Sequence, residues 1–578
     1  MGLPKDTSIP GATRLGGRLH ETVLFMEAAA ERCAASSVLV VSVFTILYLL
    51  PTIQFAAQKM LWVDEFFTLY LSTVPNWGEL LRALGTGADQ HPPSFYYLTH
   101  LCLELFGCTP VTVRLPEIFG FWLMCVALYA LFRRLLPPIW GVLAMMLPLS
   151  SGAYYYGSEA RGYGLMLGFS ALALYAWFEI TAGRRRVMSL AVLAVSSAAA
   201  VASHYYAVIA VLALGIGEIV RTIVRKKFDA PVWAAFGGSA IPLLVFASTI
   251  RTAREYSVHF WAVPVWSEVF SFYGMEPIVR AGRGPHLFGY TLNVLLGCIG
   301  VAVLIVLALP RASASRDTRR AIAIPWFAAS AVAMAIAPVF TMILAKFVTH
   351  GYSDRYAIVA VIGTTVLIVY GVCVMARQRT AVAAAAIVVC GLCFYINQRD
   401  LKMNDQFSWR GLKSDFQLLN ATQGEPVAVS DGFAFYRLSF YSPPAIYRRL
   451  TYVADAHASL EYLHSDTLDR GLLDLSPWFP LDVVPLRDYV RNHAYFLVFG
   501  YVPDRSWLIY HLPEISVETK LLGRRGGNLL FAVKTAAVRA TAGDSEIMEN
   551  RPGLSSKFIK SGRSLCEFYF GASHCPVL

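Results

Sequence analysis

The feature that most constrains this sequence is the repetition of long apolar runs. Runs of roughly 18 or more residues, each able to cross about 30 Å of hydrocarbon, recur along the first two-thirds of the chain. We place spans at approximately 36–55, 111–132, 137–157, 162–182, 187–204, 206–222, 231–250, 286–309, 321–345, 355–376 and 380–397. Only 15% of the residues are charged, whereas a soluble domain averages about 25%. The sequence therefore predicts a polytopic α-helical membrane protein with about eleven transmembrane helices.

The basic residues indicate how these spans are oriented. The net charge is +11, and many of the positive residues lie in short gaps after every second span: Arg133/Arg134, Arg184–Arg186, Arg221–Lys227, Arg311–Arg320 and Arg377/Arg379. The positive-inside rule makes these five loops cytoplasmic. It predicts a cytoplasmic N-terminus, a retained first span and an extracytoplasmic C-terminus. A nucleic-acid-binding protein would gather its basic residues on one soluble face, so no nucleic-acid partner is expected.

Three segments on the outward side are long: 56–110, 251–285 and 397–578. Residues 92–107 are too short and too polar for a span, and their aromatic content favours an amphipathic helix in the outer interface. Loop 251–285, with His259, Trp261, Trp266 and Tyr273, is a candidate lid. We divide the chain into a transmembrane domain (1–400), an extracytoplasmic soluble α/β domain (401–540) and a poorly structured tail (541–578). Cys566 and Cys575 of the tail either pair, in an oxidising compartment, or stay free.

Ionisable groups next to a membrane are informative because their burial costs several kcal/mol. In the segment LWVDEFF (61–67), Asp64 and Glu65 follow the first span and are our candidate catalytic residues. Dehydrated carboxylates can abstract a proton or bind a metal, whereas a solvated pair does neither. In ADQHPPSFYY (88–97), Asp89 and His91 are candidate metal ligands. The alternative is a helix-capping Asp beside a structural His.

Two further outward clusters contain an arginine among aromatic rings. Glu159, Arg161 and Tyr163 lie in YYYGSEARGYG (154–164), and Arg355 and Tyr356 lie in HGYSDRYA (350–357). We expect them to bind substrate, the arginines facing a phosphate. The alternative is an ordinary ion pair in a loop, which contributes little. His204, between two spans on the same side, is a third candidate metal ligand or a structural residue.

These segments carry a resemblance to a known family. VDE after the first span, DQHPPSFYYLTHLCLELFG, VTVRLPEIFG, SEARGYGLMLGFSALALYAWFE, SHYYAVIAV and SDRYAIVAVIG follow one another in this order. Together they resemble the C-type (GT-C) membrane glycosyltransferases, in the glycosyltransferase family 39 or dolichyl-phosphate-mannose-protein mannosyltransferase-like branch. The resemblance covers roughly residues 36–400 and does not extend to the outward tail.

The resemblance implies an inverting, metal-dependent transferase in a bacterial inner or plasma membrane. It would move a sugar from a polyprenyl-phosphate donor to a lipid, glycan or protein acceptor outside the cytoplasm. Asp64 matches the catalytic aspartate of the family, and Asp89, Gln90 and His91 fall where a metal- or phosphate-contacting group is placed. The implied cofactor is a divalent cation.

The chain departs from those relatives that modify lipid A. They have an Arg three residues after the catalytic Asp, where this chain has Phe67, and an acidic–Lys–Pro sequence where it has Gln90-His91-Pro92. An aminoarabinose-to-lipid-A activity is therefore not expected. Charge to hold the donor phosphate must come from Arg161, from Arg355 or from a metal.

We expect Asp64 to accept the proton of the acceptor as it attacks the anomeric carbon. A cation or an arginine would stabilise the departing phosphate. Inversion is expected because the neighbouring Glu65 points away from Asp64 in regular structure, so a second carboxylate is not beside it. Two other classes compete. A transporter would hold ionisable groups at the bilayer midplane, and a non-catalytic scaffold that binds glycans would not need Asp64.

Overall fold

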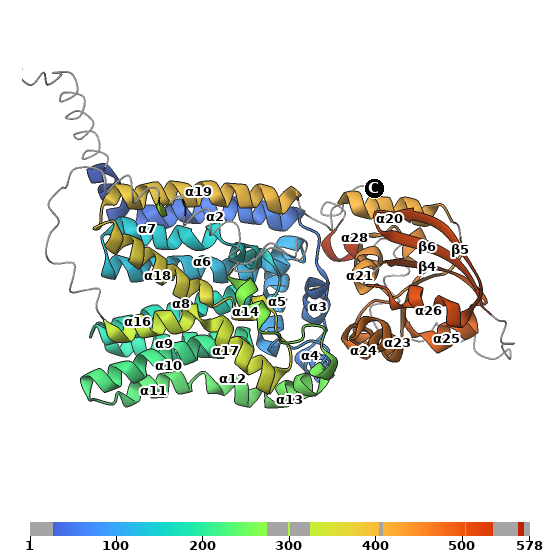
Figure 1. The fold of residues 1–578 in the computed structure, drawn as a ribbon, viewed down its shortest axis with the longest axis horizontal. Helices are drawn as coiled ribbons and strands as arrows, with labels where there is room; N and C mark the ends of the chain where they lie inside the picture. Colours follow the sequence, from blue (N-terminus) through green and yellow to red (C-terminus); the bar gives the residue numbers. More distant parts are fainter. Residues whose placement is uncertain are drawn as a thin grey trace, which may run out of the picture.

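The computed structural model of the chain describes residues 27–273, 297, 299–300, 324–403, 409–422, 424–502, 505–535 and 565–571. A bundle of long helices occupies one part of the molecule, and a smaller domain with a β-sheet lies at one end of the bundle (Figure 1). Among the described residues, six helices are long and apolar enough to cross a membrane, or up to eight if each of two bent pairs forms one span. The predicted fold class is confirmed. The number of spans stays a prediction, because 286–309 lies largely outside the described residues.

The bundle and its outer loops contain the following helices: α2 (Ser37–Gln58), α3 (Val63–Ser72), α4 (Trp77–Leu84), α5 (Pro93–Phe106), α6 (Pro110–Leu135), α7 (Pro138–Met146), α8 (Tyr163–Thr181), α9 (Arg186–Ser203), α10 (Val208–Arg225), α11 (Ala230–Gly237), α12 (Ala240–Val245), α13 (Ala247–Tyr256), α14 (Ser267–Phe272), α16 (Pro325–Ala335), α17 (Ala337–Leu344), α18 (Ala360–Met375) and α19 (Thr380–Met403). The predicted span at 321–345 is a bent pair, α16 and α17, with 56° between the two parts. Pro338 in the first turn of α17 explains the bend, because proline cannot continue the hydrogen bonding of the preceding helix.

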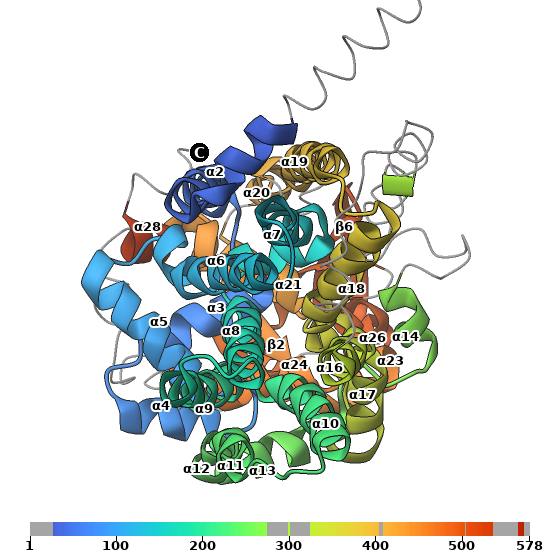
Figure 2. The same ribbon diagram turned by 90° about the vertical axis from the view of Figure 1, so that its left-hand side faces the viewer.

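Helices α6 and α8 form the centre of the bundle (Figure 2). Their backbones meet at Gly120, Gly164 and Gly168. A Cβ atom at Gly164 would lie 2.3 Å from the carbonyl oxygen of Glu117, and one at Gly168 would lie 2.3 Å from that of Gly120. Small residues allow membrane helices to approach this closely. The contact fixes the start of α8, and with it the turn that carries Glu159 and Arg161.

Short helices α3, α4 and α5 lie at the end of the bundle that faces the sheet domain (Figure 1). The helix expected at 92–107 is present as α5, which begins at Pro93. Proline suits the first turn of a helix, where its missing N–H has no helical partner to lose. Helix α3 begins at Val63, and its first turn holds Asp64 and Glu65. Carboxylates are favoured there by the positive end of the helix dipole.

The described part of the sheet domain contains six strands: β1 (Val427–Val429), β2 (Leu450–Ala454), β3 (Val483–Pro485), β4 (Tyr495–Tyr501), β5 (Ser516–Arg525) and β6 (Asn528–Thr535). Their order is β3-β2-β1-β4-β6-β5. Strands β1 to β4 pair in parallel, whereas β5 and β6 are antiparallel. The helices of the sheet domain are α20 (Trp409–Asn420), α21 (Gly432–Tyr441), α22 (Pro444–Tyr447), α23 (Ala456–Leu463), α24 (Thr467–Leu475), α25 (Leu486–Asn492) and α26 (Trp507–Ile515).

The sheet domain packs directly on α3. The ring of Phe66 stacks 5.5 Å from that of Tyr436 on α21, and the Phe67 ring lies 5.5 Å from that of Phe479. The hydroxyl of Tyr441 accepts a hydrogen bond from the backbone N–H of Leu61 at 2.9 Å. One apolar core therefore includes residues of both α3 and the sheet domain. The position of α3 depends on this contact as well as on the bundle.

One part of the predicted unstructured tail is ordered. Residues Leu565–Phe570 form a short helix, α28, in which Leu565, Cys566 and Phe570 are buried. The Phe570 ring lies 5.4 Å from that of Phe440 on α21. The prediction of a poorly structured tail is wrong for this segment, because its aromatic residues join the core between α3 and α21. Cys566 is disulfide-bonded, whereas Cys575 lies outside the described residues.

Candidate active site

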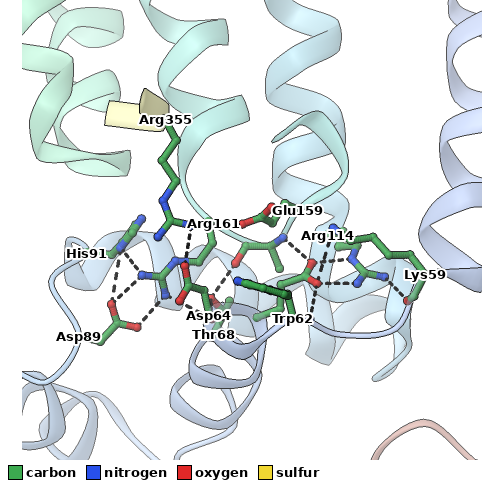
Figure 3. Close-up of polar contacts among 12 residues, drawn as sticks. Lys59, Trp62, Asp64, Thr68, Asp89, His91, Arg114, Glu159, Arg161 and Arg355 are labelled. Atoms are coloured by element: carbon green, nitrogen blue, oxygen red, sulfur yellow. Dashed lines mark hydrogen bonds and ion pairs between the residues drawn. The ribbon is translucent and has the colours of Figure 1, made fainter. Parts of the chain in front are cut away.

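Asp64 lies at the start of α3, where the helix bundle meets the sheet domain. Its side chain is 22% exposed, and its Oδ2 lies 2.8 Å from Nη1 of Arg355. Arg355 belongs to a short 3-10 helix (Asp354–Ala357) that precedes α18. The same guanidinium approaches Oε1 of Glu159 at 3.8 Å. Figure 3 shows Asp64 between Arg355 and Arg161. The structure thus brings together three segments that are far apart in the sequence.

Glu65 points away from this cluster and is completely buried. Its carboxylate accepts hydrogen bonds from Nε and Nη2 of Arg114, both at 2.7 Å, from the N–H of Ala160 at 2.8 Å and from the N–H of Trp62 at 2.9 Å. Burial opposes the charge of Glu65, but Arg114 and Lys59 outweigh it and lower the pKa of the carboxyl. This placement does not fit the predicted catalytic role. Glu65 instead ties α3 to α6 and to the turn that carries Glu159.

Asp89 and His91 lie in the loop before α5, and both contact Arg161. The Arg161 guanidinium donates to Oδ2 of Asp89 at 2.8 Å and to Oδ1 at 3.0 Å, the two-pronged geometry that arginine forms with carboxylates. Its Nη2 lies 2.9 Å from Nδ1 of His91. It also donates to the backbone oxygen of Asp64 at 3.3 Å. Arg161 therefore joins the loop at 89–91 to α3.

The pKa values of Asp89 and His91 follow from this contact. Burial opposes charge on Asp89, but the Arg161 cation outweighs it and holds the pKa of Asp89 far below its usual range. Burial and the same cation lower the pKa of His91 to about 4. His91 is therefore neutral at pH 7. With Nδ1 accepting from Arg161, the hydrogen-bond network assigns the ring proton to Nε2.

A group of rings covers the other side of the cluster. The His204 ring lies 4.8 Å from that of His91 and 4.9 Å from that of Tyr163. Tyr356 lies 5.9 Å from His204, and its ring stacks 4.6 Å from that of Tyr206. The guanidinium carbon of Arg355 lies 5.9 Å from the centre of the Tyr163 ring. All the predicted substrate and metal residues therefore lie in one cluster, and Glu65 alone is turned away from it.

Several buried polar atoms in this cluster have no hydrogen-bond partner among the described residues. They are Nε2 of His91, Oε1 of Glu159, Nε of Arg161 and Nε of Arg355. Leaving a buried donor or acceptor unpaired costs about 1–3 kcal/mol. Burial also raises the pKa of Glu159. The cations Lys59 and Arg355 oppose this shift, whereas the carboxylates Glu65 and Asp64 reinforce it. Unpaired donors and acceptors in one place are what a site for a polar ligand requires.

The residues of the predicted metal site do not fit a divalent cation in this arrangement. Both carboxylate oxygens of Asp89 accept from Arg161, and Nδ1 of His204 accepts from the N–H of Tyr206 at 3.2 Å. Within the described ranges, no group of three or more His, Cys, Asp or Glu is placed to hold a metal. Arg161 instead contacts Asp89 and His91, which the resemblance places beside a metal or a phosphate.

Two cations that support the site were not among the predicted residues. Arg114 is fully buried in α6 and also donates to the carbonyl oxygens of Lys59 and Met60, both at 3.1 Å. The sequence could have indicated Arg114, because it is a single charge one turn into an apolar span, and such a charge needs a partner. Lys59 lies with its Nζ 4.1 Å from the centre of the Tyr155 ring. Nothing in the sequence around Lys59 distinguishes it from a residue at the end of a span.

The predicted lid is described up to Tyr273, and residues 274–285 lie outside the described part. Ser257 donates from Oγ to the carbonyl oxygen of Thr349 at 3.0 Å, and the N–H of Tyr352 donates to the carbonyl oxygen of Ala262 at 2.9 Å. The loop is thus attached to the chain just before Arg355. Trp261 is 59% exposed. Closure over a sugar stays a prediction.

Comparisons with known proteins bear on the same segments. The dolichyl-phosphate-mannose-protein mannosyltransferase family matches residues 90–250, which include His91, Glu159, Arg161 and His204. Comparison with curated protein sequences gives no match. The crystal structure of ArnT from Cupriavidus metallidurans in the apo state is similar at 13% identity and a TM-score of 0.42, covering 86% of this chain and 97% of that one. The same protein bound to undecaprenyl phosphate gives 13% identity and a TM-score of 0.39, with the same coverage. The family match confirms, over residues 90–250, the resemblance of this chain to the C-type glycosyltransferases of the dolichyl-phosphate-mannose-protein mannosyltransferase branch.

Proposed function

We propose that this chain transfers a sugar from a polyprenyl-phosphate donor to a hydroxyl or amine acceptor on the extracytoplasmic side of a membrane. The observation that carries the proposal is the cluster at the end of the bundle that meets the sheet domain. There a partly exposed carboxylate, Asp64, adjoins Arg161, Arg355 and Glu159, each of which has one buried polar atom without a hydrogen-bond partner among the described residues. A ligand with one anionic group and several hydroxyls would satisfy these atoms.

A lipid-linked donor suits this position. Its apolar tail can remain in the bilayer beside the membrane helices, while its phosphate and sugar reach the cluster. Arg355 is the cation best placed for the phosphate, because Arg161 already binds both oxygens of Asp89. An arginine fork matches the geometry of phosphate oxygens. In this proposal the phosphate replaces Asp64 as the partner of Arg355.

That exchange prepares Asp64 for catalysis. Once it is released from Arg355, the Asp64 carboxylate accepts the proton of the acceptor hydroxyl or amine. The acceptor atom forms a bond to the anomeric carbon, and the bond from that carbon to the phosphate oxygen breaks with its electron pair. Arg355 stabilises the charge that develops on the departing polyprenyl phosphate. A single displacement of this kind inverts the anomeric centre.

Glu159 is proposed to recognise the donor sugar through a hydrogen bond. Its Oε1 is buried and lacks a hydrogen-bond partner among the described residues, and it lies on the same side of Arg355 as Asp64. A carboxyl oxygen in that place can accept a hydrogen bond from a sugar hydroxyl. Glu65, by contrast, is saturated by Arg114 and two backbone N–H groups and has no lone pair left to act as a nucleophile.

The experiment uses the full chain in lipid nanodiscs with a panel of polyprenyl-phospho-sugars and a crude envelope acceptor. We expect one donor to release polyprenyl phosphate, and the product to have the opposite anomeric configuration. Release should continue with EDTA present, since an arginine supplies the charge. Loss with EDTA and recovery with Mg²⁺ or Mn²⁺ would overturn the arginine assignment. A folded chain that releases nothing from any donor, with acceptor present, would contradict the proposed function.

A further inference from the structure

A line of partly exposed side chains leads away from Asp64 onto the sheet domain. Trp62 is two residues before Asp64, and its ring lies 5.1 Å from that of Phe433, at the start of α21. The guanidinium carbon of Arg505 lies 5.0 Å from the centre of the Phe433 ring and 4.9 Å from that of Tyr501. All four are neither buried nor fully exposed. We call Trp62, Phe433, Arg505 and Tyr501 the aromatic–arginine strip.

The strip reaches the sheet at the place where ligands bind in open α/β sheets. Phe433 follows β1 and Arg505 follows β4, and these two strands are parallel neighbours. The connection from β1 goes to β2 on one side, whereas β4 lies on the other side, so the strand order reverses between them. The carboxyl ends of the strands at such a reversal form the usual ligand crevice.

Arg505 is held between two rings. Among the residues that the structure describes, none forms a hydrogen bond or salt bridge with it, although the negative charge of Asp431 interacts with it electrostatically. The neighbouring carboxylate, Asp431, instead accepts from the N–H of Ala434 at 3.2 Å and caps α21. Stacking on rings fixes a guanidinium without using its N–H donors. Those donors remain available for a carboxylate or phosphate.

We infer that the aromatic–arginine strip binds the acceptor, and that the acceptor is an acidic saccharide. Arg505 would bind its anionic group, and the Trp62 and Phe433 rings would pack against the apolar C–H faces of its sugar rings. Trp62 would bring the acceptor hydroxyl toward Asp64. This inference rests on the proposed function for the reaction, but the binding of a saccharide can be tested separately from it.

The first arm of the test measures binding by the full chain in neutral-lipid nanodiscs. The probes are a hexamer of galacturonic acid and the neutral hexamer of galactose. We expect the acidic probe to bind more tightly, and Arg505→Ala to weaken it about tenfold, the effect of losing one charge-assisted contact. Arg505→Lys should recover part of the affinity. Phe433→Leu keeps an apolar side chain for folding and should weaken binding of both saccharides.

Arg524→Ala is the matched control, because Arg524 is an exposed cation on the edge strand β5 of the same domain. It should leave binding unchanged. Equal binding by wild type and Arg505→Ala, with both variants folded, would overturn the inference. If Arg505 instead supports binding of poly-glutamate or of nanodiscs containing phosphatidylglycerol, and not of the acidic hexamer, the saccharide assignment is overturned.

The second arm measures release of polyprenyl phosphate at varied acceptor concentration. Arg505→Ala should raise the KM for the acceptor and leave kcat and the KM for the donor unchanged. A merely structural role would lower kcat and the amount of folded enzyme instead. Absence of release by the wild type, with Arg505-dependent binding intact, would count against the proposed function and not against the strip. Normal release with no Arg505 effect would count against the strip alone.

Discussion

Asp64 and Arg355 form the contact at the centre of this site, and neither residue is placed by its own segment alone. Asp64 depends on the capped start of α3, where the N–H of Trp62 donates to Glu65. Arg355 depends on a short helix that is attached through Tyr352 to the loop at Ala262. Each is the other's ion-pair partner at 2.8 Å. A phosphate that takes Arg355 therefore also changes the state of Asp64.

Replacement of Arg355 tests this exchange. Arg355→Ala should lower kcat/KM for the donor about 10²–10³-fold, the range found when one preorganised donor to a developing charge is removed. Arg355→Lys should recover a part, because it keeps the charge and loses the fork. Steady-state kinetics with the active donor measures both. Arg251, whose side chain is 83% exposed, is the control. An Arg355→Ala variant as active as Arg251→Ala would contradict the role of Arg355.

Glu65 and Arg114 should behave as one unit. Either single alanine substitution leaves a buried charge without its partner, which destabilises a protein by about 3–5 kcal/mol. The thermal midpoint should fall sharply for Glu65→Ala and for Arg114→Ala. The double variant should fall by much less than the sum of the two. Additive changes would mean that the two residues are not coupled, contrary to their 2.7 Å contacts.

At the scale of elements, the sequence predicted what depends on local pattern. The spans that became α2, α6, α8 and α19, the helix α5 and the placement of Asp64 after the first span all follow from apolar length and proline position. The close approach of α6 and α8 at Gly120 and Gly164 did not follow, because it depends on which helix faces which. The buried role of Glu65 was missed for the same reason. Adjacent carboxylates look alike in sequence, and only packing decides which one reaches solvent.

The sheet domain contains a buried acid whose ionisation should make the stability of the domain depend on pH. Asp469 on α24 is buried and accepts from Nε1 of Trp507 at 3.1 Å and from the N–H of Asp455 at 3.2 Å. Burial outweighs these hydrogen bonds and raises the pKa of Asp469 to about 7. In the unfolded chain the carboxyl ionises near pH 3.9. Between these values the folded state binds more protons, so the domain loses stability as the pH rises.

Asp469→Asn should remove this dependence. The wild-type thermal midpoint of the sheet domain should fall between pH 5 and pH 8, and the variant should change less over the same interval. The difference between the two midpoints should therefore be larger at pH 8. Hydrogen exchange of the β2 and β4 amides at the two pH values provides a local measurement. The same pH dependence in wild type and variant would show that Asp469 is not the titrating group.

At the scale of the whole molecule, the association of the two domains was beyond sequence reasoning. The sheet domain was expected in the outward tail, and the sheet is there. Its attachment to α3 through Phe66, Phe67 and Tyr70 was not expected, because a run of aromatic residues does not indicate which distant segment it packs against. Helix α28 was missed because its six residues follow a long polar segment. Contacts between residues hundreds of positions apart leave no local pattern.

This association has a consequence for the reaction. The same helix, α3, places Asp64 beside Arg355 and packs its aromatic residues against α21. The sheet domain therefore takes part in placing the proposed base. An acceptor bound on the sheet domain and a donor held by the bundle would meet at Asp64, which is where the two parts of the molecule join.

The role of Asp64 is tested most directly by the release of polyprenyl phosphate from the active donor in nanodiscs, compared between wild type, Asp64→Asn and Glu104→Gln. Glu104 is the matched control, a carboxylate 63% exposed on α5. Removing a general base costs about 10²–10⁴-fold, so Asp64→Asn should lose at least that much activity while it still binds donor and keeps the wild-type thermal midpoint. Glu104→Gln should match wild type. Equal release by Asp64→Asn and wild type would contradict the assignment of Asp64 as the catalytic base.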